Sequence, residues 1–247
     1  MTTADQRPSI TVAIMCYNEA PSLEHVVTEI REQLERMGHV HEIVIIEDGS
    51  TDGSREIAQR LSREHACVRV VQHPVNLGLG AVYRDGFTCG RMDVGTLFPA
   101  DGQFEPSIIP QFVRRIQEGA DLVLGYIPGL HANRSFMGWF FSWSERLLYK
   151  ILFGKFPEFQ GIMMFRRPLI DTIPLTCKGR GWMIQMELIL RLQKKGCRIV
   201  GEPTGLRARM SGASKVMNLK SILSNLGQVF VLRWRLFGSN DAPKPVS

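Results

Sequence analysis

The first half of the chain alternates short apolar runs with longer segments whose apolar residues recur every three or four positions. The short runs are rich in β-branched residues and lie at 9–16, 42–46, 67–71, 95–98 and 120–125. Such runs predict strands, and the amphipathic segments between them predict helices, the first opening at Pro21 and ending near Gly38. Strands that alternate with helices are typical of βαβ units. The pattern therefore predicts an α/β fold with a mainly parallel, doubly wound sheet, which binds ligands beyond the carboxyl ends of its strands.

The second half of the chain is less regular. Residues 136–153 form an aromatic, amphipathic stretch, which predicts either a core helix or a helix lying in a membrane interface. The other predicted elements are strands at 162–165 and 198–200 and helices at 182–194 and 216–237. We interpret residues 1–238 as one domain whose two halves divide at about residue 125, and 239–247 as a disordered tail.

Composition is that of an ordinary globular protein and excludes several classes. The 247 residues are 44% hydrophobic and 22% charged, which excludes a disordered or fibrous chain. No apolar run approaches the roughly 18 residues of a spanning helix, and the N-terminus lacks a secretory pattern. Five cysteines without CxxC spacing indicate neither a disulfide framework nor a zinc site, so we expect buried thiols. These features predict a soluble or membrane-surface cytoplasmic protein.

The net charge of +6 conceals an asymmetry between two parts of the chain. Residues 1–100 carry 9 Lys and Arg against 14 Asp and Glu, whereas residues 101–247 carry 21 against 10. A basic half suits phosphates, a nucleic acid or an anionic membrane surface, and charge alone does not choose among them. No nucleic-acid-binding module is recognisable, so we expect no nucleic-acid partner.

Polar clusters follow three of the predicted strands. They are Asn18-Glu19, Glu47-Asp48 and Asp101. Carboxylates in this position can hold a nucleoside and a divalent ion that neutralises a diphosphate, although each cluster alone is also explained by helix capping or turn formation. Three clusters at successive strand ends favour a shared ligand site.

Six stretches carry a resemblance to a known family. In chain order they are CYNEAPSLEHVV, IIEDGSTDGS, NLGLGAVYRDGF, PADGQF, FQGIMMFRR and RMSGASKV, spanning residues 10 to about 217. The chain resembles the family 2 glycosyltransferases and, within them, the dolichyl- or polyprenyl-phosphate sugar synthases. The resemblance implies a GT-A-type, Rossmann-like fold and an inverting transfer of a hexose from a nucleotide-diphosphate sugar to a polyprenyl phosphate. The first half of the domain is then the donor half and the second the acceptor half.

The resemblance also assigns the donor side of the site. It implies that Tyr17, Asn18, Glu19, Asp48 and Asp101 contact the donor, and that Asp101 and Gln103 hold a divalent cation, Mg²⁺ or Mn²⁺. The sequence departs from the family's pattern at two positions. Glu47 stands where the family usually has aspartate, and Pro99 takes the place of the first metal-binding aspartate. Because Mg²⁺ commonly uses only one or two carboxylates together with waters and substrate phosphates, we expect a functional site.

On the acceptor side, the resemblance implies a cradle of basic and hydroxyl groups for the lipid phosphate. Its members are Arg134, Arg209, Ser214 and Lys215, and Asp101, Arg134 and Arg209 are the expected catalytic residues. Gly125-Tyr126-Ile127 lacks an arginine that the family often carries there. An acceptor tail in the bilayer implies peripheral binding at the cytoplasmic face of a membrane, with the possibility of a separate membrane subunit.

Two other functions remain open. In the first, the same fold glycosylates a hydroxyl group and Glu187 serves as the base, since a neutral hydroxyl must lose its proton. Under the phosphate-acceptor hypothesis, Glu187 is structural and pairs with a nearby arginine. In the second, Pro99 and the absent arginine at Ile127 mark a protein that binds nucleotide sugars without catalysis.

Overall fold

The structure is a computed structural model that describes residues 7–129, 150–154, 157, 159, 161–177, 181, 183–210 and 229–234. The strands are β1 (Ile10–Cys16), β2 (His41–Glu47), β3 (Val68–Gln72), β4 (Val94–Pro99), β5 (Leu122–Tyr126), β6 (Met163–Arg166) and β7 (Ile199–Pro203). The helices are α1 (Ala20–Met37), α2 (Ser54–Glu64), α3 (Leu79–Thr88), α4 (Ile108–Gln117), α6 (Arg167–Asp171) and α7 (Met183–Lys194).

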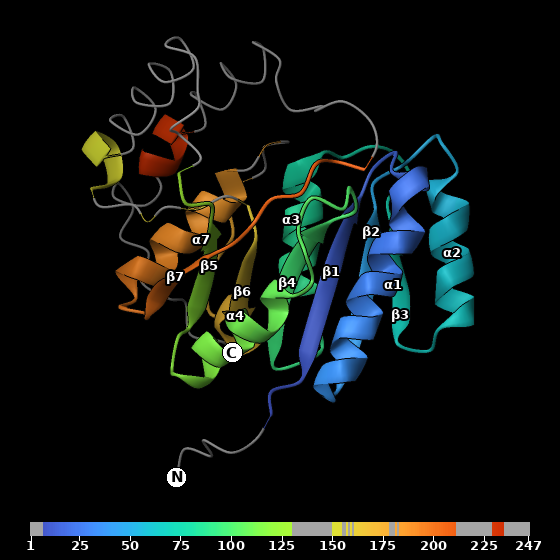
Figure 1. Cartoon of the computed structure of the whole chain (residues 1–247). Coiled ribbons are helices and arrows are strands. Elements are labelled where there is room, and N and C mark those ends of the chain that lie inside the picture. The colour runs from blue at the N-terminus through green and yellow to red at the C-terminus, as the bar shows by residue number, and fades with distance from the viewer. Residues whose placement is uncertain are drawn as a thin grey trace, which may run out of the picture.

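All seven strands form one sheet in the order β3-β2-β1-β4-β6-β5-β7 (Figure 1). β1 pairs in parallel with both β2 and β4, β2 with β3, and β5 with β7. β6 is antiparallel to its neighbours β4 and β5. The prediction of an α/β fold with a mainly parallel sheet is therefore confirmed, and the antiparallel insertion of β6 is an addition to it.

Helices cover both faces of the sheet, because side chains alternate between the two faces along each strand. On one face, Val12 and Ile14 of β1 pack in a core cluster with α1, α2 and α4. On the other face, Ala13 and Met15 belong to a second cluster with α3, α6 and α7. Figure 1 shows α1 and α4 in front of the sheet and α3 and α7 behind it.

The predicted elements of the first half match the observed ones closely. α1 ends at Gly38, which adopts φ 64° and donates its backbone N–H to the helix's last carbonyl groups. The amphipathic segments after the predicted strands 42–46 and 95–98 contain α2 and α4, as expected. In the second half, the short helix α6 was not predicted, and β7 runs to Pro203 instead of ending at residue 200.

Several predictions concern residues outside the described part. Of the stretch 136–153, residues 150–153 are helical, and of 216–237, residues 229–234 are helical; the remainder of both stretches and the tail 239–247 lie outside the described residues. Within the described residues, no helix is long and apolar enough to cross a membrane. The five cysteines are free thiols, of which Cys16 and Cys177 are buried and the other three are half-buried.

Candidate active site

The three polar clusters meet at one edge of the sheet. β1 lies between β2 and β4, so the residues that follow these strands are neighbours in space. Asp48 donates its backbone N–H to Cys16 of β1 at 2.9 Å, and Ala100 donates to Met15 of β1 at 3.0 Å. The fold thus brings Asn18-Glu19, Glu47-Asp48 and Asp101 together, as their positions after strand ends indicated.

The loop after β1 is held to the loop after β2. Asn18 adopts φ 53°, a left-handed conformation that asparagine tolerates better than most residues. Its side-chain oxygen accepts a hydrogen bond from the backbone N–H of Thr51 at 2.8 Å, and its own N–H donates to Ser50 Oγ at 3.0 Å. The backbone N–H of Glu19 donates to Ser54 Oγ at 2.9 Å. The two loops therefore form one surface, on which Tyr17 is half-buried.

Glu47 is fully buried, and its carboxylate is used within the protein. It accepts the backbone N–H of Ser50 at 2.5 Å and an ion pair from Arg55 at 3.1 Å. Arg55 also donates to the carbonyl of His73 at 3.1 Å. The longer glutamate at this position thus ties β2 to α2 and to the segment after β3.

Asp48 is 2% exposed and is saturated with hydrogen bonds. Its oxygens accept from the backbone N–H groups of Leu77 at 2.8 Å and Gly78 at 2.9 Å, and from the side chain of Asn76 at 3.0 Å. His73 Nδ1 contacts it at 2.6 Å. Asp48 therefore fixes the segment 73–78, which leads into α3.

The same segment depends on a glycine. Gly49 adopts φ 68°, and a Cβ at this position would lie 2.4 Å from the backbone carbon of Val75. Only glycine fits both the left-handed conformation and this close approach.

His73 lies between two carboxylates. Its Nε2 contacts Asp85 of α3 at 2.6 Å, so the ring bridges Asp48 and Asp85. Burial alone would lower the pKa of His73, but the hydrogen bonds to the two aspartates raise it above its ordinary value. Sequence reasoning missed this residue, although it follows β3 directly and the rule that found the other clusters applies to it.

Asp101 is nearly buried at the exit of β4, and its carboxylate binds an arginine from a distant part of the chain. Arg209 Nη2 lies 2.9 Å from Asp101 Oδ2 and 3.4 Å from Gln103 Oε1, and Arg209 Nη1 lies 4.0 Å from Glu19 Oε1. The other Asp101 oxygen accepts the backbone N–H of Gln103 at 3.1 Å. The guanidinium is thus surrounded by three oxygen-bearing side chains that were assigned to the donor and metal sites.

The segment after β7 carries Arg209 to this place. It crosses from β7 over the front of the sheet to the edge beside β1 (Figure 1). Arg207 donates its backbone N–H to Gln103 O at 2.8 Å, and Met210 donates to Asp101 O at 3.2 Å. Gly102 has φ 73°, and a Cβ there would lie 2.6 Å from the sulfur of Met210. The loop 101–103 and the segment 207–210 are therefore packed directly against each other.

Pro99 is accommodated at the end of β4 without loss of a strand hydrogen bond. Its partner in β1 is Met15, whereas the pairing of β4 with β6 ends at Thr96. A proline is tolerated at a strand end where no neighbouring strand needs its N–H. The position thus contributes backbone structure and no metal-binding carboxylate.

The residues at the β4 exit fit a divalent cation. Asp101 and Gln103 offer a carboxylate and an amide oxygen, the hard donors that Mg²⁺ and Mn²⁺ prefer. The Arg209 guanidinium on these oxygens shows that they attract a cation. Among the described residues, no group of three or more His, Cys, Asp or Glu side chains could hold a metal ion by itself. A cation at Asp101 and Gln103 would therefore need substrate phosphates and waters as its other ligands.

Glu187 of α7 is fully buried and serves as an anchor for the backbone. It accepts hydrogen bonds from the N–H groups of Thr176 and Cys177 at 2.9 Å and 2.8 Å, and pairs with Arg191 at 3.0 Å. Burial would raise the pKa of Glu187, but these bonds lower it below its ordinary value. A carboxylate with occupied lone pairs and a lowered pKa is a poor base. The predicted pairing with a nearby arginine is present.

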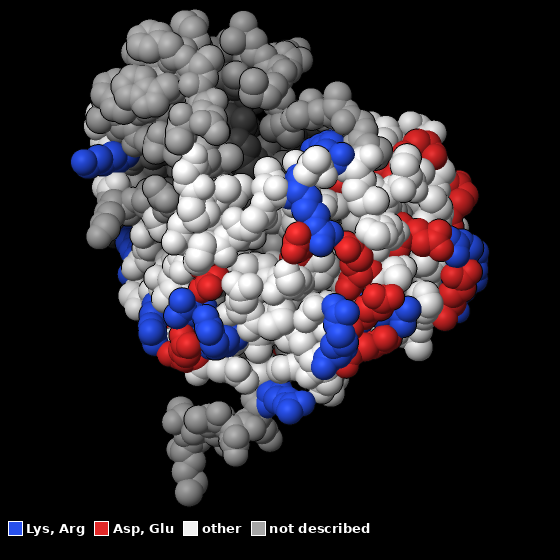
Figure 2. Space-filling view, viewed as in Figure 1, with Lys and Arg blue, Asp and Glu red and all other residues white. Residues whose placement is uncertain are grey.

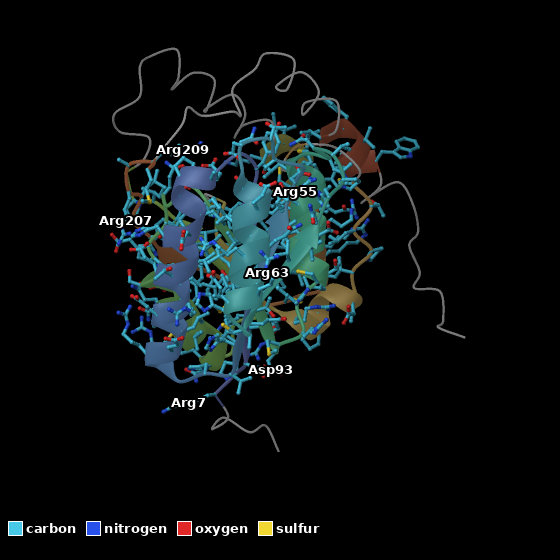
Figure 3. The ribbon with its side chains drawn as sticks, turned by 90° about the vertical axis from the view of Figure 1, so that its right-hand side faces the viewer. Arg7, Arg55, Arg63, Asp93, Arg207 and Arg209 are labelled. Carbon is cyan, nitrogen blue, oxygen red and sulfur yellow. The ribbon has the colours of Figure 1, made fainter. Side chains whose placement is uncertain are left out.

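The predicted acceptor residues divide into two groups. Arg209 is described and lies at the candidate metal site, on the same edge of the sheet as Arg55 and opposite to the edge at Asp93 (Figure 3). Arg134, Ser214 and Lys215 lie outside the described residues. Their assignment stays a prediction.

Comparison with curated proteins yields two relatives that are named for dolichol phosphate and polyprenol monophosphomannose. A dolichol-phosphate mannosyltransferase of Pyrococcus furiosus is 27% identical over 91% of this chain, which spans 64% of that protein's length. A polyprenol monophosphomannose synthase of Mycolicibacterium smegmatis is 28% identical over 95% of this chain and 90% of its own length.

Comparison with solved structures confirms the GT-A-type fold. A glucosyl-3-phosphoglycerate synthase of Mycobacterium tuberculosis, in complex with Mn²⁺, UDP and phosphoglyceric acid, matches 99% of this chain and 84% of its own with a TM-score of 0.70 at 21% identity. The family model for glycosyl transferase family 2 matches residues 11–173, well over half of the chain. The resemblance carried by the six sequence stretches is thereby confirmed, and the chain belongs to glycosyl transferase family 2.

Proposed function

We propose that this protein transfers a hexose from a nucleotide-diphosphate sugar to a polyprenyl phosphate, with a divalent cation at Asp101 and Gln103. The observation that carries the proposal is the meeting of oxygen donors and an arginine at the exit of β4. Such a site can bind both a cation and an anion, as transfer between two phosphate-bearing substrates requires. The two curated relatives that act on lipid phosphates support the choice of acceptor.

The donor half supplies binding and orientation. Tyr17, Asn18 and Glu19 form the surface beside β1 on which the nucleoside is expected to lie, and their loop is held in place by the loop after β2. Asp48 acts through the segment 73–78, which it fixes beside this surface. When bound, the cation neutralises the diphosphate and stabilises it as a leaving group.

The acceptor side needs positioning and charge compensation more than a base, because a lipid phosphate is already an anionic nucleophile. A phosphate oxygen attacks C1 of the sugar, and the bond between C1 and the diphosphate oxygen breaks with its electron pair going to the nucleoside diphosphate. Arg209, together with Arg134, Ser214 and Lys215, is expected to hold the acceptor phosphate during this displacement.

Exposed apolar side chains of the acceptor half support binding at a membrane surface. In the helical residues 229–234, Phe230, Val231 and Trp234 are 56%, 50% and 76% exposed, whereas Val229 and Leu232 are buried in the core. Ile151 of the helical residues 150–153 is 70% exposed, and its neighbour Leu152 packs against the same core cluster as Val229. Apolar side chains on helices whose opposite face is anchored in the core suit insertion into a membrane interface.

The first experiment is an assay of label transfer. Purified protein is incubated with a panel of radiolabelled UDP- and GDP-sugars, a short polyprenyl phosphate and Mg²⁺ or Mn²⁺, and the organic-extractable product is counted. We expect labelled lipid from one donor, and no product when EDTA removes the cation.

A parallel reaction offers saccharide acceptors that carry only hydroxyl groups. Product in that reaction, without labelled lipid, would replace the proposed acceptor by a hydroxyl. Donor binding without product in either reaction would favour the non-catalytic hypothesis.

A further inference from the structure

The side chain of Arg209 lies where a divalent cation would contact the protein. Its guanidinium contacts Asp101 Oδ2 at 2.9 Å and Gln103 Oε1 at 3.4 Å. These are the two side chains that fit a hard cation at the exit of β4. Glu19 Oε1, at 4.0 Å, completes the ring of oxygens around the guanidinium. A divalent cation on these oxygens would place its charge next to the positive guanidinium, so the two cations compete for the negative charge of Asp101.

The side chain of Arg209 can move while its backbone stays in place. The hydrogen bonds of Arg207 and Met210 to the loop 101–103 flank Arg209 and hold the segment in place. The Arg209 side chain is 22% exposed, so it can leave Asp101 by rotation about its own bonds.

We propose that Arg209 is the resident counter-ion of the Asp101–Gln103 site and that it leaves these oxygens when a divalent cation binds. Its guanidinium then becomes available to an acceptor phosphate. The identity of that acceptor rests on the proposed function, whereas the competition for Asp101 does not.

Because of this exchange, the charges at the site determine the order in which the cation, the donor and the acceptor bind. Without a cation, Arg209 neutralises Asp101 and is unavailable to a second anion. With the cation and the nucleotide bound, the arginine carries a positive charge that lacks its carboxylate partner, which favours binding of a phosphate. Acceptor binding is thereby coupled to prior binding of the donor and its cation, a coupling that must act equally in both directions.

The test measures Mn²⁺ binding to nucleotide-free protein by electron paramagnetic resonance and by calorimetry. Removal of the competing charge in Arg209→Gln should tighten Mn²⁺ binding by about 3- to 10-fold, the range expected for a charge-assisted, partly exposed pair. Arg209→Lys keeps the charge and should remain close to the wild-type affinity. Unchanged or weaker Mn²⁺ binding by Arg209→Gln would overturn the proposal.

Arg207→Gln is the matched control. Arg207 comes from the same segment but pairs with Glu105 at 2.7 Å and Glu29 at 3.1 Å, away from Asp101. Its replacement should leave Mn²⁺ binding unchanged. Tightening as large as that of Arg209→Gln would show that net charge alone explains the effect, which would also overturn the proposal.

A second measurement uses the wild-type protein and does not depend on any variant folding. Binding of geranyl phosphate is measured by calorimetry with and without Mn²⁺ plus UDP or GDP. We expect binding to tighten by about 5-fold or more when cation and nucleotide are present, as for a coupled pair of sites. Equal or weaker binding would refute the release of Arg209.

The two measurements also separate this inference from the proposed function. Mn²⁺ competition without sugar transfer to lipid would refute the acceptor and support the counter-ion role. Sugar transfer to lipid without Mn²⁺ competition would support the acceptor and refute the counter-ion role.

Discussion

Two aspartates at neighbouring strand exits of this protein have different surroundings. Asp48, after β2, accepts hydrogen bonds from Leu77, Gly78, Asn76 and His73, all within the protein. Asp101, after β4, has one oxygen on a backbone N–H and the other on the guanidinium of Arg209. A carboxylate held by fixed backbone groups is a structural element, whereas one held by a movable side chain can exchange its partner for a ligand.

Charge distribution extends this contrast across the molecule. Acidic side chains gather over α1 and α2, on the right-hand side of Figure 2. The arginine at Asp101 instead comes from the basic second half of the chain. The candidate active site thus lies where the acidic and the basic part of the chain meet.

The largest expected effect on activity comes from Asp101→Asn. The neutral amide weakens cation binding, and we expect the rate of sugar transfer to fall by about 100-fold or more, the scale of losing several kcal/mol of charge stabilisation. The rate is measured with saturating donor and lipid phosphate. Glu105→Gln is the matched control, because Glu105 belongs to the same loop but pairs with Arg207. Full activity of Asp101→Asn would remove Asp101 from the metal site.

At the other aspartate, Asp48→Asn should mainly lower the stability of the protein. An amide cannot accept from every donor that faces Asp48, so buried N–H groups lose their partner, at a cost of about 2–4 kcal/mol in the free energy of unfolding. Urea denaturation measures this change. Asp85→Asn, at a carboxylate that is 35% exposed, should cost less. An unchanged midpoint for Asp48→Asn would contradict the structural role.

The buried Glu187 allows the same test of a structural carboxylate in the acceptor half. Glu187→Gln removes the charge that holds Thr176, Cys177 and Arg191, and we expect a loss of about 2–3 kcal/mol of stability. At a temperature where the variant stays folded, transfer to lipid phosphate should continue. Loss of transfer only with hydroxyl acceptors would instead identify Glu187 as a base.

The bridge at His73 predicts a dependence on pH. Since Asp48 and Asp85 raise the pKa of His73 in the folded protein, its contribution to stability is fully present below the unfolded pKa of about 6.5 and is lost as the pH rises through the folded value. His73→Gln should therefore cost most near pH 6, about 2–3 kcal/mol for two charge-assisted hydrogen bonds. The gap to the wild type should narrow toward pH 9. Denaturation curves at several pH values measure it, and a constant gap would speak against a charged bridge.

The smallest effect concerns the surface of the acceptor half. Trp234→Glu should weaken binding to anionic lipid vesicles by about 10-fold, roughly the contribution of one large apolar side chain, without loss of stability. Val40→Glu is the control, because Val40 is 72% exposed but precedes β2 at the opposite edge of the sheet. Equal vesicle binding by both variants would exclude this surface as the membrane contact.

The sequence predicted the architecture well because strands and helices of the first half have clear periodicity. It also predicted that Glu19, Asp48 and Asp101 meet at one edge, since parallel strands end together. It did not distinguish Asp48 from Asp101, because that difference depends on residues 25 to 108 positions further along the chain. The antiparallel direction of β6 could not be predicted from the local sequence either, because the alternation of apolar and polar residues is the same in parallel and antiparallel strands.

The place of β6 also bears on how the chain folds during synthesis. β4 and β5 do not pair with each other, and β6 joins them by pairing with both. The strands β3, β2, β1 and β4 can therefore assemble as soon as residue 99 has left the ribosome, but the edge of β4 stays open until residues 163–166 emerge. A nascent chain of intermediate length carries an unprotected sheet edge, and we expect it to depend on chaperones over that interval.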